Sequence, residues 1–166
     1  AKGNIGYIRV VSFSEKTEKM TKEAIEKLTK EIGKENVQGF ILDLRNNPGG
    51  LLDQAVAVCD LFLEGGEIVS TRSRKPEDTM RFSATAGDMI KGLPLVVLIN
   101  EGSASASEIV AGALKDHRRA LVVGLKSFGK GSVQTIRSIP GFGGIRMTTA
   151  RYYTPSGISI DFKFTH

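Results

Sequence analysis

The chain has 166 residues, of which 23 are Lys or Arg, 18 are Asp or Glu, two are His and one is Cys. Its 40% apolar and 25% charged residues are typical of a globular protein, so we expect one folded domain over residues 1–166. One Cys and two separated His cannot build a disulfide or a zinc cage, and we expect no metal and no cofactor. The charge of +5 forms no basic stripe, and no apolar run approaches a membrane span, so neither nucleic acid nor a membrane is an expected partner.

The first part of the chain alternates strand and helix patterns. Apolar alternation predicts a strand over residues 4–13, and helical spacing predicts an amphipathic helix over residues 17–34. A continuous run of strand formers predicts a buried strand over residues 37–44. A turn rich in Gly and Asn follows at residues 46–50, and a helix is expected over residues 51–63. Cys59 lies on the apolar stripe of that helix, which favours a core residue over a nucleophile.

The second part repeats this order and then changes its period. We expect a strand over residues 67–74, a polar loop or short hairpin over residues 75–91 and a buried strand over residues 95–99. A helix of small residues is expected over residues 104–114, with a third buried strand at residues 120–123. From residue 132 apolar residues alternate around the glycines at residues 141–144, which predicts a β-hairpin. The order indicates an α/β fold with a mixed sheet and a C-terminal β-hairpin.

Three serines, Ser103, Ser105 and Ser107, lie where the strand at residues 95–99 meets the next helix. Backbone N–H groups converge at a helix N-terminus and stabilise the negative charge of a tetrahedral intermediate, so a nucleophilic serine is chemically reasonable here. From the residues alone, a Ser-rich helix cap is the favoured interpretation. A nucleophilic hydroxyl also needs a base.

The candidate bases are His117 and Lys130. His117 lies at the far end of the same helix, on the order of 15 Å from the serines, and fits a residue that meets the helix dipole. A lysine can take the place of histidine when its surroundings favour the neutral amine. Lys130, flanked by Gly129 and Gly131, is therefore the candidate.

Nucleotide binding is a competing interpretation of the same segment. Residues 124–130 match all but the last position of a phosphate-binding loop, and the strand that ends in Asp43 resembles one that holds magnesium in such proteins. Against this, Gly131 occupies the place of the required Ser or Thr, and the residues after it alternate like a strand. The pattern therefore disfavours a nucleotide.

Three motifs occur in order: DLRNNPGG at residues 43–50, GSASASE at residues 102–108, and FGKG at residues 128–131 followed by Gln134. With these, the chain from about residue 3 to residue 160 resembles the carboxyl-terminal processing peptidases, or tail-specific proteases. The resemblance implies the Clp protease/crotonase-like α/β superhelix. A crotonase-type acyl-CoA enzyme would share that fold, but no residue supports it.

The resemblance implies a serine endopeptidase that cleaves proteins at or near their C-terminal tails through an acyl-enzyme. Ser105 corresponds to the nucleophile, Lys130 to its general base, and Gln134 to a residue that orients the lysine.

The resemblance also places an oxyanion hole at the backbone N–H groups of Gly50 and Ala106. Glu108 and Asp116 match acidic positions that support the site in this family.

The resemblance further implies partners and a location. The expected substrates are proteins or peptides with unstructured C-termini, and the expected partner is a PDZ domain of the same full-length chain. The expected location is extracytoplasmic, in the bacterial periplasm. Neither the PDZ domain nor an export signal is found in this sequence, and residues 161–166 depart from the usual family ending. An alternative is a core that binds peptides but cannot process them without its PDZ domain.

Overall fold

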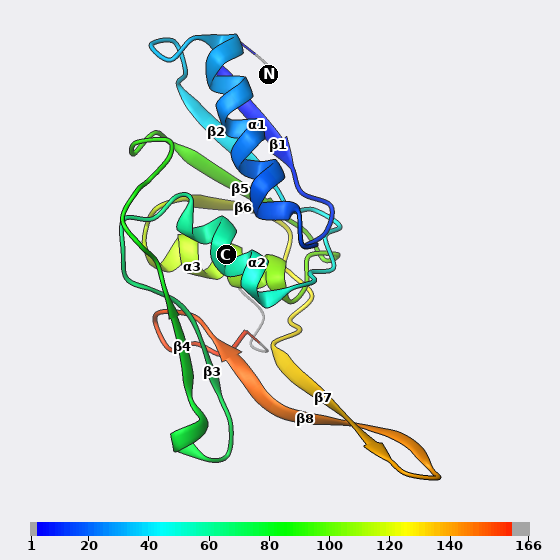
Figure 1. The fold of residues 1–166 in the computed structure, drawn as a ribbon. Coiled ribbons are helices and arrows are strands. Elements are labelled where there is room, and N and C mark those ends of the chain that lie inside the picture. The colour runs from blue at the N-terminus through cyan, green and yellow to red at the C-terminus, as the bar shows by residue number, and fades with distance from the viewer. Residues whose placement is uncertain (1–2, 161–166) are drawn as a thin grey trace.

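This computed structural model describes residues 3–160, which form two four-stranded sheets and the helices packed against them (Figure 1). The first sheet is parallel. Each of its strands is joined to the next by a long crossover connection that contains a helix, as parallel pairing requires. Its strand order is β1-β2-β5-β6, and its strands are β1 (Ile5–Arg9), β2 (Gly39–Asp43), β5 (Leu95–Ile99) and β6 (Leu121–Gly124).

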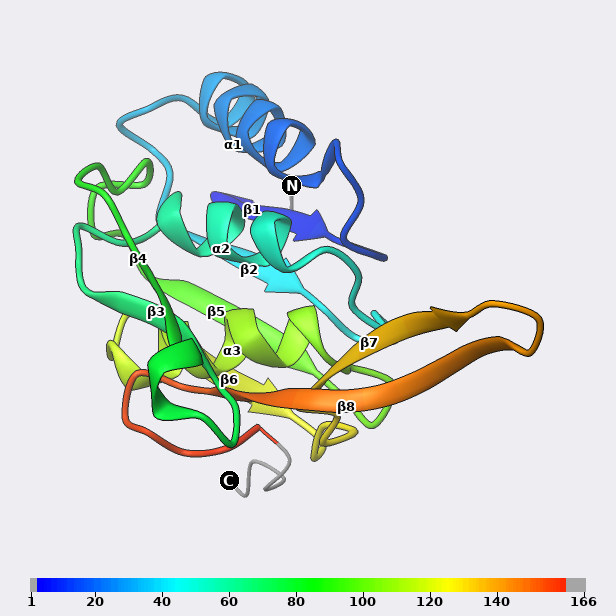
Figure 2. The ribbon, with the colours of Figure 1, turned by 60° about the horizontal axis from the view of Figure 1, so that its bottom comes forward.

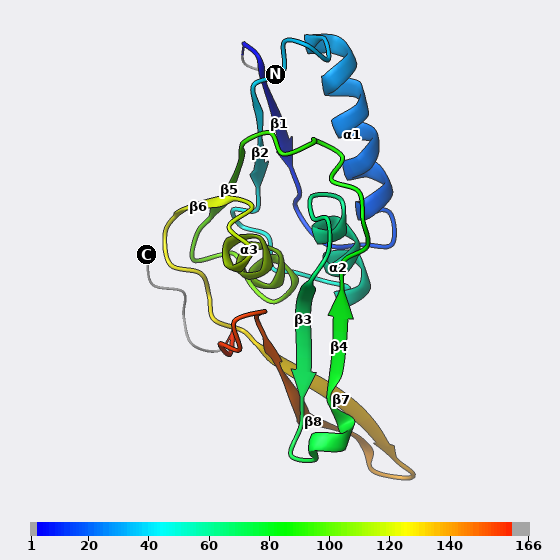
Figure 3. The same ribbon diagram turned by 90° about the vertical axis from the view of Figure 1, so that its left-hand side faces the viewer.

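Three helices cover the parallel sheet and link it to the second sheet. Their bounds are α1 (Thr17–Ile32), α2 (Leu52–Asp60) and α3 (Ala106–Asp116). Helix α1 packs on β1 and α2, whereas α2 and α3 pack on each other and on β3 of the second sheet (Figure 3). The core therefore lies around α2 and α3, where Val58, Val110 and Leu114 are fully buried.

The second sheet is antiparallel and has the order β4-β3-β8-β7. Its strands are β3 (Glu67–Arg72), β4 (Met80–Ser83), β7 (Ser132–Ile139) and β8 (Gly143–Tyr153), with a 3-10 turn, Pro76–Asp78, between β3 and β4. The β7–β8 hairpin projects from the body of the molecule (Figure 2), and Phe142 at its tip is 90% exposed. Because β7 is paired on one side only, it is a free edge of this sheet.

The structure confirms the α/β class and the C-terminal hairpin. Parallel and antiparallel pairing are divided between two sheets, because the β3–β4 hairpin pairs with β8 and not with the buried parallel strands. The segment expected as a loop or short hairpin over residues 75–91 supplies β4, and the first strand ends at Arg9, earlier than expected. Cys59 is fully buried, as expected for a core residue, and burial raises the pKa of its thiol.

No helix within residues 3–160 is long and apolar enough to cross a bilayer. The unusual ending expected at residues 161–166 lies outside the described part of the chain.

Candidate active site

The turn after β2 is fixed to the start of α3 through Asn47, whose side chain is fully buried. Asn47 Nδ2 donates to the Val10 carbonyl at 2.7 Å, and Oδ1 accepts the Gly49 N–H at 2.9 Å. The Asn47 carbonyl accepts the Ala104 N–H at 3.0 Å and the Ser107 hydroxyl at 2.9 Å. One residue thus sets the positions of both segments.

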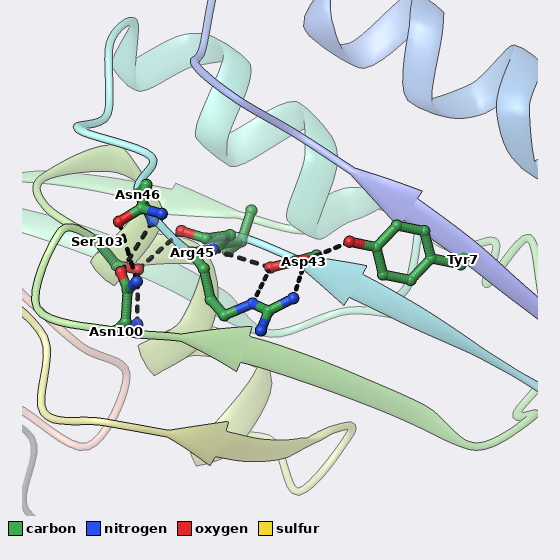
Figure 4. Close-up of polar contacts among 7 residues, drawn as sticks. Tyr7, Asp43, Arg45, Asn46, Asn100 and Ser103 are labelled. Atoms are coloured by element: carbon green, nitrogen blue, oxygen red, sulfur yellow. Dashed lines mark hydrogen bonds and ion pairs between the residues drawn. The ribbon is translucent and has the colours of Figure 1, made fainter.

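A second group of hydrogen bonds joins the same two segments (Figure 4). Ser103 Oγ donates to the Leu44 carbonyl at 2.7 Å and accepts the Asn100 N–H at 3.1 Å. Asn100 Oδ1 accepts the Asn46 N–H at 2.8 Å, and Asn100 Nδ2 donates to Asn46 Oδ1 at 3.0 Å. These bonds satisfy backbone N–H and carbonyl groups of the turn, which have no partner in the sheet once the strand has ended.

The three serines are therefore not equivalent. Ser103 and Ser107 are 0% exposed, and their hydroxyls donate hydrogen bonds to the carbonyls of Leu44 and Asn47, respectively. Ser105 is partly exposed and caps α3 with φ 55° and ψ −114°. Such a backbone conformation is strained for a residue with a side chain, and strain of this kind concentrates at functional sites.

The glycine turn lies against Ser105. A Cβ on Gly49 would fall 2.8 Å from Ser105 Cβ and 2.9 Å from the Ala106 nitrogen, so only glycine permits this approach. Gly50 is exposed, and within residues 3–160 neither its N–H nor that of Ala106 finds a hydrogen-bond acceptor. The two expected oxyanion donors thus lie on segments in direct contact, and neither is used by a hydrogen bond within the described residues.

Glu108 joins the serine turn to the lysine loop. Its carboxylate is fully buried, and Oε1 accepts the N–H of Ser105 at 3.0 Å and that of Lys130 at 2.9 Å. Oε2 accepts the Ser127 hydroxyl at 2.7 Å and the Gly129 N–H at 2.9 Å. Four donors on one carboxylate satisfy both of its oxygens and offset the cost of burying it.

Lys130 is placed beside Ser105 through its backbone, and not through a bond of its ammonium group. Both amide nitrogens bond to one oxygen, so they lie at most about 6 Å apart. The Lys130 side chain is exposed, and no hydrogen bond joins it to Ser105 within the described residues. Gln134 is exposed on β7 opposite Thr148, and among the described residues it makes no hydrogen bond to Lys130.

Asp116 and His117 lie at the other end of α3. Asp116 Oδ2 accepts the N–H and the hydroxyl of Ser156 at 3.0 and 2.7 Å, so it holds the turn after β8. His117 Nε2 lies 2.6 Å from the Glu67 carbonyl. Neither side chain faces Ser105, and His117 is not placed to act as its base, as the helix length predicts.

The structure also bears on cofactors. The residues after Lys130 form strand β7, whereas a phosphate-binding loop opens a helix, so the nucleotide interpretation is wrong. No group of His, Cys, Asp and Glu side chains within residues 3–160 could hold a metal ion.

An ion-pair cluster beneath the glycine turn was not predicted from the sequence (Figure 4). Asp43 at the end of β2 is fully buried, accepts the Tyr7 hydroxyl, and is bound by Arg45 through Nε at 2.9 Å and through a terminal nitrogen at 2.7 Å. Burial opposes ionisation, but the bonds from Arg45 and Tyr7 outweigh it and lower the pKa of Asp43 to about 2. An Asp that ends a buried strand two residues before an Arg was the available clue.

An apolar groove beside the site was also not predicted. Its volume is about 320 Å³, and its walls come from the start of α2, the β3–β4 hairpin and the β7–β8 hairpin. Leu52 in this lining follows Gly50 by two residues, and Val133 follows Lys130 by three, so the groove adjoins both parts of the site. The remaining apolar lining is Met80, Phe82, Ala150 and Tyr152.

The chain belongs to a family of serine peptidases: the model of peptidase family S41 matches residues 4–165. A carboxy-terminal-processing protease of Bartonella bacilliformis is 59% identical over 95% of this chain and 36% of its own length. A chloroplastic C-terminal processing peptidase of Tetradesmus obliquus is 38% identical over 97% of this chain and 34% of its own. The family resemblance found in the sequence is thereby confirmed.

A solved structure supports the fold. The chain of a photosystem II D1 C-terminal processing protease superposes with a TM-score of 0.87 at 37% identity, covering 97% of this chain and 41% of that one. The chain thus spans about a third of the length of these curated relatives. The Clp protease/crotonase-like class expected from the motifs agrees with this match.

Proposed function

We propose that this chain is the catalytic core of a serine endopeptidase in which Ser105 and Lys130 form the dyad. The neutral amine of Lys130 takes the Ser105 hydroxyl proton as Oγ attacks the substrate carbonyl. The proton then passes to the leaving amine, and an ester forms between Ser105 and the new carboxyl end of the substrate. Water, activated by the same amine, hydrolyses this acyl-enzyme and regenerates Ser105.

The observation that carries this proposal is the carboxylate of Glu108, shared by the amides of Ser105 and Lys130. It holds the two backbones close enough for the flexible lysine stem to reach Ser105 Oγ by side-chain rotation. The same carboxylate fixes the loop at Gly129. Glu108 is a positioning residue here. Gln134, four residues after Lys130 on β7, would orient the rotated lysine.

The free N–H groups of Gly50 and Ala106 would stabilise the oxyanion. They lie on the turn and on the first residue of α3, where the helix dipole also favours negative charge. Because both donors belong to the backbone, they are fixed before the substrate binds.

The proposed substrate is an unfolded C-terminal tail. An extended peptide can pair with the free edge of β7 while a side chain enters the apolar groove between Leu52 and Val133. Recognition of the tail itself would belong to a PDZ domain elsewhere in the full-length chain, and the location would be extracytoplasmic, in the bacterial periplasm. The cleavage of C-terminal tails follows the printed names of the relatives, which are C-terminal processing enzymes of a bacterium and a chloroplast. The PDZ domain and the location are what the family resemblance implies.

A second candidate is a peptide-binding core that does not cleave by itself. The exposed Lys130 side chain, which makes no hydrogen bond to Ser105 within the described residues, favours it. Cleavage of an unfolded protein by the full-length enzyme and by this chain separates the two. Cleavage by both supports the dyad in the isolated core, and cleavage by the full-length enzyme alone supports the second candidate. If neither form cleaves, the proposed function is wrong.

A further inference from the structure

The β7–β8 hairpin carries apolar side chains that the fold leaves exposed. Its outer half extends beyond the other elements (Figure 2), with Phe142 at the tip and Ile136, which is 67% exposed, further back. The other exposed apolar side chains of the hairpin are Ile139, Ile145 and Met147. Exposed apolar side chains that gather on one segment are typical of a surface that meets a partner or a membrane.

These apolar side chains lie on both faces of the hairpin. Ile136 pairs with Arg146, and Arg137 pairs with Ile145, in the antiparallel register. Because successive residues of a strand point to opposite faces, the two pairs lie on different faces, and each face has an isoleucine and an arginine. A hairpin that docks on a protein through one face keeps a polar face toward water. A partner that covers this tip must instead surround it, as a lipid layer surrounds an inserted segment.

The part of the chain that contains the hairpin is strongly basic. Residues 117–160 hold seven Lys and Arg and no Asp or Glu, whereas residues 1–116 hold 15 basic and 17 acidic residues. Strands β7 and β8 therefore carry positive charge and no acidic side chain of their own. Charge complementarity favours a negatively charged partner, and the headgroups of anionic lipids attract nearby Lys and Arg.

The arginines lie at a distance from the tip that suits a lipid surface. Arg137 and Arg146 are two and three positions behind the pair of Ile139 and Gly143 that closes the hairpin, which is about 7 to 10 Å along the strands. Interfacial segments bury their apolar side chains about 5 to 10 Å into the boundary between headgroups and acyl chains. With Phe142 among the acyl chains, both guanidinium groups would reach the lipid phosphates, since an arginine has a long apolar stem.

We propose that the tip of the β7–β8 hairpin inserts into the surface of a membrane that contains anionic lipids. Phe142 enters the apolar layer, and Arg137 and Arg146 bind lipid phosphates. Such a contact needs no membrane-spanning segment, so the expectation of no membrane partner, which depended on the length of apolar runs, does not extend to it. The contact uses neither Ser105 nor Lys130, so it does not depend on the proposed peptidase function.

The first test is cosedimentation with vesicles, for the full-length enzyme and for this chain. One vesicle preparation is phosphatidylcholine alone, and the other is phosphatidylcholine with phosphatidylglycerol in equal parts. Both proteins should bind the mixed vesicles about tenfold more tightly than the neutral ones or better. Failure of either protein to bind the mixed vesicles would overturn the proposal.

Variants separate the hairpin from the net charge of the protein. Arg137→Gln with Arg146→Gln should weaken binding to the mixed vesicles about tenfold or more, and Phe142→Ser should weaken it about tenfold. The matched control, Lys19→Gln with Lys22→Gln at exposed positions of α1, removes the same charge and should weaken binding far less. Equal weakening in the control would show attraction by net charge alone, which contradicts the proposal.

The second test places a fluorescent reporter at the tip of this chain. The chain has no Trp, so Phe142→Trp introduces a single indole, and Met20→Trp, at an exposed position of α1, is its control. On mixed vesicles, emission from the Phe142→Trp chain should shift to shorter wavelength and be quenched by brominated acyl chains, and emission from the control should do neither. Quenching in both chains or in neither would exclude insertion of the tip. The same spectral shift without lipid, on self-association or with a nucleic-acid oligomer, would assign the tip to that partner and overturn the proposal.

Discussion

The backbone N–H groups of Ser105 and Lys130 donate to the same oxygen, Oε1 of Glu108, at 3.0 and 2.9 Å. The two residues are 25 positions apart and belong to different elements, so this bond pair is a tertiary contact. It fixes the separation of the two backbones independently of where the lysine side chain points. The shared carboxylate makes the geometry of the proposed dyad depend on a residue that takes no part in the chemistry.

Replacement of Glu108 by Gln should therefore reduce activity strongly. One of the two oxygens becomes an NH₂ group that faces N–H donors, and a buried charge-assisted network loses about 2 to 5 kcal/mol. Peptide cleavage and amide exchange at residues 127–130 should report a looser lysine loop. Glu101→Gln, at an exposed position near the same helix, is the control and should leave both unchanged. Unaltered exchange in Glu108→Gln would contradict the positioning role.

The three serines should separate by phenotype. Ser105→Ala should lose activity by about 10³-fold or more in the full-length enzyme while the fold survives, with at most the loss of about 0.5 to 2 kcal/mol that removal of a helix N-cap side chain causes. Ser103→Ala and Ser107→Ala each leave a buried carbonyl without its hydroxyl donor, so each should lower the unfolding free energy by about 1 to 3 kcal/mol. Urea unfolding and cleavage assays measure the two effects. Normal cleavage by Ser105→Ala would remove it as the nucleophile.

Lysine at position 130 should not be replaceable by arginine. Guanidinium remains protonated at working pH and cannot accept the serine proton, so Lys130→Arg should be as inactive as Lys130→Ala. Lys126→Arg, on an exposed residue of the same loop, is the matched control and should keep full activity. Cleavage by Lys130→Arg at more than a few per cent of the normal rate would show that position 130 supplies only a positive charge.

The buried Asp43 should make the fold sensitive to acid. Its pKa of about 2 lies below the value of 3.8 in an unfolded chain, so ionised Asp43 stabilises the fold above about pH 4. That stabilisation, about 2 kcal/mol, is lost as the pH falls from about 4 to 2. Urea unfolding at several pH values should show this loss in the native sequence and not in Asp43→Asn. Asp78→Asn, at an exposed residue, should behave as the native sequence does.

The apolar groove should select side chains near the scissile bond. An active core should prefer apolar residues there, because Leu52, Phe82 and Tyr152 form an apolar wall. A charged substrate side chain placed against this wall would lose hydration without gaining a hydrogen-bond partner from these three residues. Met80→Glu should lower kcat/KM for such peptides about tenfold, since Met80 lines the groove and is already 57% exposed. Met147→Glu, 48% exposed on the hairpin and outside the groove lining, is the matched control. A peptide library with a flat profile at every position would exclude this role for the groove.

Local sequence determined much of the fold. The strand at Leu95–Ile99 was predicted at its observed bounds, and α1, α2 and α3 each agree to within about three residues, because their apolar periods are strong. The hairpin followed from its alternation and glycines. The motifs also identified the family, which the S41 match confirms.

Local sequence pattern could not determine which side chains from distant parts of the chain meet. Nothing local distinguishes Ser105 from Ser103 and Ser107, whose hydroxyls are occupied by carbonyls about 60 positions earlier in the chain. Local pattern likewise did not place the apolar groove, since it requires two hairpins and the start of α2 to meet. The physical reason is that periodicity records how one element meets water and core, whereas a site is made where several elements satisfy each other's polar groups. The sequence by itself set the elements and the family, and tertiary packing decided which of their polar groups remain free to act.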